Sequence, residues 1–70
     1  MDEQEFLQKL SVRTNVNIEL LKELTGNDKF WSLIKTGNMF EAVHLLRDLQ
    51  SRVGLRDAKM VVEAFIEEYK

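Results

Sequence analysis

The clearest structural signal in this sequence of 70 residues lies at positions 54–65, GLRDAKMVVEAF. A glycine and a leucine precede a charged turn, and apolar residues then recur every three or four positions. This spacing is typical of a helix that buries one face. The face consists of Ala58, Val61, Val62, Phe65 and Tyr69. We therefore expect the chain to end in an amphipathic helix that begins just after Gly54.

The preceding segment, residues 38–53, predicts a second helix that packs against the first. Asn38 is a favourable N-cap, and Glu41 follows three residues later, as in a variant of the capping box. Its apolar face consists of Met39, Ala42, Leu46, Leu49 and Val53. We expect a tight corner at Gly54, with Leu55 filling it and Ala58 letting the two helices approach.

Shorter helices are predicted in the N-terminal half of the chain. Asp2 caps the first, Gly26 ends the second and Gly37 ends the third, which begins at Asn27 or Asp28. In the third helix Trp31 is expected to be a core residue, with an interface role as the alternative.

No stretch alternates between apolar and polar residues over a useful length, which excludes strands. We predict an all-α fold, a small bundle of four to five short helices in a single domain. The N-terminal helices lie in residues 1–36 and a helical hairpin lies in residues 37–70. A chain this short buries only about 60% of its unfolded surface. Without cysteines, its stability depends on close helix packing or on a second copy of the chain.

The charge distribution indicates a protein partner. Lysine and arginine total 10 against 12 acidic residues, a net charge of −2, which makes nucleic acid an unlikely partner. Residues 35–59, however, carry five basic and three acidic residues. A locally basic surface on an acidic protein favours an acidic protein partner. The residues predicted to bind this partner are Arg47, Arg56, Lys59, His44 and Arg52.

Catalytic and metal chemistry find little support in the sequence. His44 and Asp48 are four residues apart on one predicted helix and could meet a serine, but no loop motif accompanies them. One histidine without cysteine is a poor zinc site, and no glycine-rich loop would hold phosphate. We expect a non-enzymatic protein without a cofactor.

The cellular location predicted from the sequence is the cytoplasm. No apolar window of about 18 or more residues could span a bilayer. The start of the chain, MDEQEF, is acidic and lacks the features of a secretory signal. We therefore expect no membrane partner.

Two other functions remain open. The helix–glycine–helix units are similar to helix-turn-helix DNA binders, and Arg56 and Lys59 in the later unit are better placed for DNA than Asp28 in the earlier one. Alternatively, the chain self-associates, as a homodimer for example, with Trp31 or the edge formed by residues 65–69 at the interface.

Residues 37–63 resemble the helical hairpin in the C-terminal domain of the bacterial ribosomal stalk protein. GNMFEAVHLLRD is similar to the first helix of that hairpin and GLRDAKMVVE to its second. The resemblance implies recruitment of translational GTP-binding factors through basic residues. Arg47 and Lys59 match the arginine and lysine of that family, and Arg56 replaces a lysine. Met39 and His44 stand where lysine is usual. The strands that flank the hairpin in that family have no counterpart here, so we expect an adaptor module rather than a ribosomal stalk.

Overall fold

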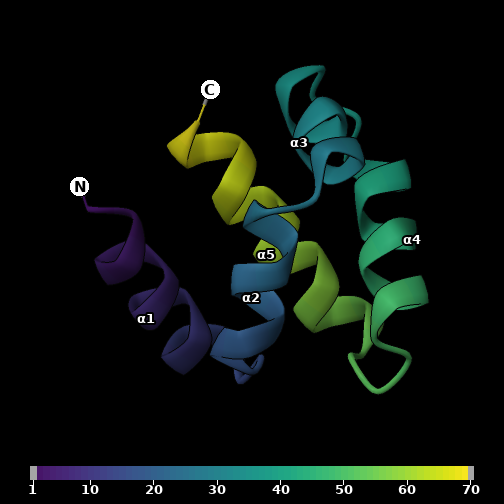
Figure 1. Cartoon of the computed structure of the whole chain (residues 1–70). Coiled ribbons are helices and arrows are strands. Elements are labelled where there is room, and N and C mark those ends of the chain that lie inside the picture. The colour runs from purple at the N-terminus through teal and green to yellow at the C-terminus, as the bar shows by residue number, and fades with distance from the viewer. Residues whose placement is uncertain (1, 70) are drawn as a thin grey trace.

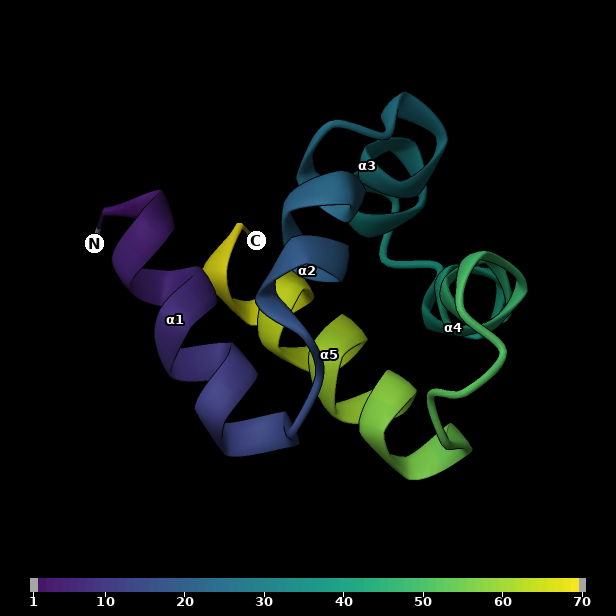
Figure 2. The same cartoon turned by 60° about the horizontal axis from the view of Figure 1, so that its bottom comes forward.

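The computed structural model describes residues 2–69, which form five helices and contain no strand, so the predicted all-α fold is confirmed. The helices are α1 (Glu3–Thr14), α2 (Ile18–Thr25), α3 (Asp28–Lys35), α4 (Met39–Leu49) and α5 (Leu55–Glu68). The last helix, α5, contacts α1, α3 and α4. In Figure 1, α5 runs behind α2, and Figure 2 shows it between α1 and α4.

One apolar core receives side chains from all five helices. The largest fully buried side chains are Phe30, Phe65, Leu21, Leu24, Leu46, Val61 and Val62. Phe65 lies at the centre of an aromatic cluster: its ring is edge-on to Phe6 at 5.4 Å and to Phe30 at 5.3 Å between ring centroids. Edge-to-face pairs add attraction beyond the burial of area. The cluster therefore joins α1, α3 and α5.

Trp31 is half-buried and belongs to this core rather than to a free surface. Its Nε1 donates a hydrogen bond to the Thr25 carbonyl oxygen, and its ring lies edge-on to Tyr69 at 4.6 Å. Burial raises the pKa of the Tyr69 phenol. Phe65 is fully buried, so it is not available as part of the self-association edge predicted at residues 65–69.

Asparagine side chains cap three of the helices. The Oδ1 atoms of Asn17, Asn27 and Asn38 accept hydrogen bonds from backbone N–H groups in the first turns of α2, α3 and α4. The predicted cap at Asp2 is wrong, because its side chain makes no capping hydrogen bond. The Asp2 backbone carbonyl instead accepts from the N–H of Phe6 at 2.9 Å. A carboxylate in the right position therefore did not suffice to form a cap.

The connection between α3 and α4 is short, and its residues cap the two helices. Gly37 has a φ of 72°, and its N–H donates to the Ile34 carbonyl, while the N–H of Asn38 donates to the Leu33 carbonyl. These two bonds form a Schellman motif. Asn38 then caps α4 by accepting from the N–H of Glu41 at 3.3 Å. Because the Asn38 N–H already has a partner, only half of the predicted capping box forms.

Replacing Gly37 with alanine should reduce the free energy of unfolding by about 1–2 kcal/mol, because an L-residue is strained at this positive φ. The matched control is Gly54→Ala. Gly54 has a φ of −70°, and a Cβ added there would meet no atom within 4 Å. We expect a change within about 0.5 kcal/mol for the control. Urea titration followed by the fluorescence of Trp31 measures both free energies of unfolding. Equal losses of stability in the two variants would contradict the left-handed conformation of Gly37.

The turn between α4 and α5 differs from the prediction. The fourth helix ends at Leu49 rather than Val53, because Gln50 adopts extended backbone angles. Leu55, expected to fill the corner, is 55% exposed. Val53 in this turn is partly buried and packs against the core instead. Since Gly54 itself has ordinary extended angles, the corner does not require a glycine.

Candidate functional site

A groove of about 590 Å³ lies between α4 and the start of α5. Its lining is mainly apolar and includes two large apolar side chains that are exposed to solvent. The lining residues are Met39, Phe40, Val43, His44, Arg47, Leu55 and Lys59. Val43 is buried and forms the base, while Phe40 and Leu55 are 80% and 55% exposed. The groove is therefore a place where large apolar groups remain uncovered.

Phe40 is the most conspicuous of these groups. It lies one residue beyond the start of α4, on a side of the helix that does not enter the core. Its ring is tilted against the imidazole of His44 one turn later, with centroids 6.1 Å apart. An exposed aromatic side chain beside an exposed leucine is the kind of apolar surface that marks binding sites. Packing within the chain therefore leaves this apolar area uncovered.

Every ionisable residue that lines the groove is basic. Arg47 lies in the last turn of α4, Lys59 lies one turn into α5, and both are exposed, as is His44. Within residues 2–69 the one ion pair is between Lys9 and Glu5, on α1, so the two groove cations have no carboxylate partner there. The site thus combines uncovered apolar surface with charge of a single sign.

The structure gathers three of the five residues predicted to bind a partner. His44, Arg47 and Lys59 line the groove, whereas Arg52 borders a separate hollow with residues of the α1–α2 connection. Arg56 is exposed but does not line the groove. It is turned by about 100° around α5 from Leu55, which does line it. Adjacency in sequence therefore did not translate into a shared surface.

Sequence reasoning missed the apolar half of this site. Phe40 falls outside the three-to-four residue spacing that defines the buried face of α4, and Leu55 was assigned to the corner. A large aromatic residue outside an amphipathic stripe is a signal of exposed apolar surface. Its four-residue spacing from His44 places both side chains on one face. The exposure of Leu55, by contrast, depends on how the turn between α4 and α5 closes.

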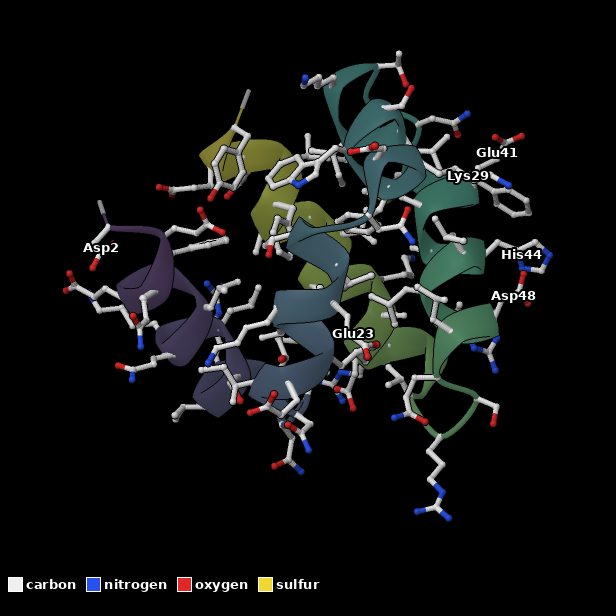
Figure 3. The ribbon with its side chains drawn as sticks, viewed as in Figure 1. Asp2, Glu23, Lys29, Glu41, His44 and Asp48 are labelled. Carbon is white, nitrogen blue, oxygen red and sulfur yellow. The ribbon has the colours of Figure 1, made fainter. Side chains whose placement is uncertain are left out.

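The candidate catalytic pair is not assembled. His44 and Asp48 point outward from α4 (Figure 3), and no hydrogen bond or ion pair between them occurs in the described part of the chain. Among residues 2–69, no three histidine, aspartate or glutamate side chains gather closely enough to hold a metal ion. His44 instead lies against Phe40 on the rim of the groove.

Comparison of the chain with protein-family models, with curated proteins and with solved structures finds no match. None of the helices in residues 2–69 has the length and apolar character needed to cross a bilayer.

Proposed function

We propose that this protein is a non-enzymatic interaction module, an adaptor that binds an acidic segment of a partner protein in the groove between α4 and α5. The observation that carries the proposal is the combination of exposed Phe40 and Leu55 with the unpaired cations Arg47 and Lys59. A partner that fits has one or two bulky apolar side chains flanked by carboxylates. The apolar groups bind in the groove and the carboxylates meet its basic rim.

The two kinds of contact have different consequences for binding. Covering an exposed phenylalanine or leucine side chain contributes about 1.5–3 kcal/mol. An exposed ion pair contributes about 0.2–1 kcal/mol. The apolar contacts therefore supply most of the affinity, while the charges select the partner and steer its approach. An acidic segment without bulky apolar residues should bind weakly.

A second copy of the chain does not fit this groove in a symmetric dimer. Twofold symmetry brings the same surface of both copies together. Arg47, Lys59 and His44 of each copy would then face the same basic residues of the other, and like charges across an interface are costly. The charge of the groove therefore favours a different, acidic protein.

The resemblance to the ribosomal stalk hairpin suggests where such a partner occurs. The resembling segment, residues 37–63, includes every residue that lines the groove. In that family the hairpin recruits translational GTP-binding factors through basic residues. A component of the translation apparatus is thus the first class of partner to test.

The charge of the groove can be tested by the double substitution Arg47→Glu and Lys59→Glu. The probe is a fluorescein-labelled peptide in which glutamates flank leucines at helical spacing, and the measurement is fluorescence anisotropy. Replacing two attractive pairs with repulsive ones should cost about 1.5–3 kcal/mol, roughly a tenfold to hundredfold rise in Kd. A peptide with glutamine in place of glutamate should bind native protein more weakly.

The matched control is Lys22→Glu with Lys29→Glu, which makes the same change in charge at exposed positions of α2 and α3 outside the groove. It should bind the peptide as the native chain does. Equal loss in both variants, or no binding by the native chain, would contradict the proposal. Duplex DNA serves as a further probe: tighter binding to DNA than to the peptide, weakening steeply with salt, would favour the DNA-binding alternative instead.

A further inference from the structure

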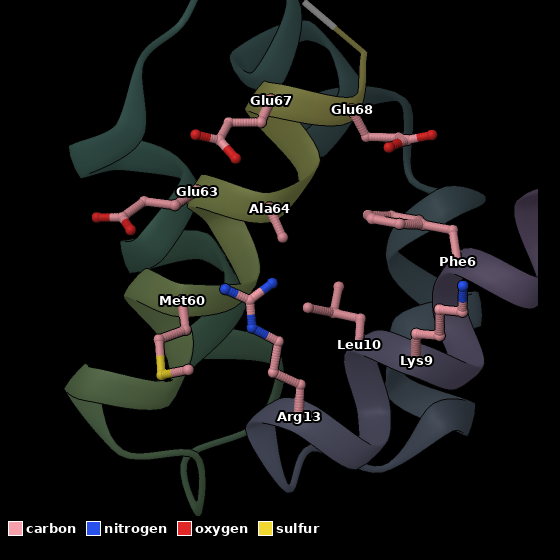
Figure 4. A pocket seen from close by; sticks show the side chains of 9 residues that line it. All are labelled: Phe6, Lys9, Leu10, Arg13, Met60, Glu63, Ala64, Glu67 and Glu68. Carbon is pink, nitrogen blue, oxygen red and sulfur yellow. The ribbon is translucent and has the colours of Figure 1, made fainter. Parts of the chain in front are cut away.

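A second groove, with a volume of about 520 Å³, lies between α1 and α5 and shares no lining residue with the basic one. Its base is apolar and its borders are charged. The lining residues are Phe6, Lys9, Leu10, Arg13, Met60, Glu63, Ala64, Glu67 and Glu68. Figure 4 shows this groove from close by. We call it the α1–α5 groove.

The α1–α5 groove carries both signs of charge, separated by helix. The cations Lys9 and Arg13 lie on α1, and the carboxylates Glu63 and Glu67 lie on α5. Both pairs have a spacing of four residues, so the two cations and the two carboxylates repeat at the same distance, about 6 Å, along their helices. The two rows are therefore matched in spacing and opposite in charge.

These rows do not neutralise each other within one copy of the chain. No ion pair joins α1 to α5 in residues 2–69, and the one contact of this kind, between Lys9 and Glu5, is internal to α1, exposed and 3.5 Å long. Figure 4 shows the reason: Arg13 extends toward α5, whereas Glu63 and Glu67 point away from α1. The carboxylates of Glu63 and Glu67 are thus exposed to solvent and accessible to another molecule.

Apolar surface of the α1–α5 groove lies between its charged borders. Val12, which is 86% exposed near the end of α1, is turned by about 100° around the helix from Arg13 and does not line the groove. Partly buried Met60 and Ala64 offer apolar surface between the two charged borders of the groove. The groove therefore presents an apolar base between its basic and acidic borders.

We propose that the α1–α5 groove is a self-association surface, which two copies of this chain bury in a twofold dimer. In this dimer Lys9 and Arg13 of each copy meet Glu63 and Glu67 of the other. The apolar base of each groove, with Met60 and Ala64, is covered between these contacts. Because twofold symmetry makes every contact occur twice, a surface carrying both signs in separate rows is self-complementary. The basic groove of α4 and α5, with its single sign, is not.

The dimer should be weak and sensitive to salt. A standard interface buries about 800 Å² per partner, which is about one sixth of the 4787 Å² surface of this chain. The apolar side chains that line the groove are already buried or partly buried within each copy, and exposed ion pairs contribute little and are screened by salt. The Lys9–Glu5 pair is exposed as well, so Lys9 can exchange one carboxylate for another at little cost.

Two variants with exchanged charges test this proposal. One carries Lys9→Glu and Arg13→Glu, and the other carries Glu63→Lys and Glu67→Lys. Each variant alone places like charges together at both symmetric contacts and should remain a monomer of about 8.2 kDa. In an equimolar mixture, every contact again joins opposite charges. The mixture should therefore form a dimer that contains one copy of each variant.

Sedimentation equilibrium measures the outcome between about 10 μM and about 1 mM, a range suited to an interface of modest area. Native protein should shift toward twice the monomer mass at low salt and return toward monomer at high salt. Because all four positions are exposed, we expect both variants to keep their helices. Circular dichroism checks this. A native chain that stays monomeric, variants that dimerise alone, or a mixture that stays monomeric would each overturn the proposal. None of these substitutions touches the basic groove, so its peptide binding is measured independently.

Discussion

Replacing Phe65 with alanine should remove most of the stability of this protein. The side chain is fully buried and its ring contacts the rings of Phe6, Phe30, Trp31 and Tyr69, with centroid distances between 5.3 and 6.1 Å. Truncating a buried phenylalanine costs about 3–5 kcal/mol, because the removed atoms lose their contacts and leave a cavity. A chain of this length has a total stability of about 4–10 kcal/mol. The variant should therefore be largely unfolded at moderate temperature.

Thermal unfolding followed by far-ultraviolet circular dichroism measures this loss. The matched control is Phe40→Ala, which removes the same atoms from a side chain that is 80% exposed. We expect the control to change the free energy of unfolding by no more than about 0.5 kcal/mol, since it leaves no cavity. It should instead weaken binding of the acidic peptide. Similar destabilisation by both substitutions would show that the aromatic cluster is not the centre of the core.

Replacing Leu46 with alanine should be nearly as damaging. Leu46 is fully buried in α4, and truncation of a buried leucine costs about 2–5 kcal/mol. Its matched control, Leu49→Ala, makes the same change in the same helix at a side chain that is 46% exposed. We expect the control to cost less than about 1 kcal/mol, because much of that side chain is already in water. Urea unfolding followed by Trp31 fluorescence compares the two.

This pair of substitutions also tests where α4 packs. The apolar spacing of the sequence assigns Leu46 and Leu49 to the same buried face. The structure separates them, because Leu46 is fully buried whereas Leu49, the last residue of α4, is 46% exposed. If the two variants lose equal stability, the last turn of α4 is packed more closely than the structure shows.

The sequence predicted the helices well because the chain marks their ends with residues of distinct chemistry. Asn27 and Asn38 cap the helices that follow them, and Gly37 adopts the left-handed conformation that ends α3. These signals are local, acting over one turn of helix. The end of α4 has no such marker, and there the prediction ran four residues too far.

The candidate site was only partly predictable for a related reason. The charge type and spacing of Arg47 and Lys59 are visible in the sequence, and both residues line one groove. Whether Leu55 is buried or exposed depends on the rotation of α5 after the turn, which spacing within a single helix does not specify. The position of Arg52 could not be predicted either. It lies in the turn between α4 and α5, where helical spacing does not determine the direction of a side chain.

The short connection between α3 and α4 has a consequence for the conformational entropy lost on binding. Gly37 and Asn38 satisfy the end of one helix and the start of the next without a spare residue, so α4 is held firmly at its N-terminus beside Phe40. The backbone at this end of the groove is therefore preorganised, and under the proposed function the protein loses little backbone entropy when a partner segment binds. The ordering cost then falls on the partner, and a partner segment that is already helical when free should bind more tightly than a disordered one of the same composition.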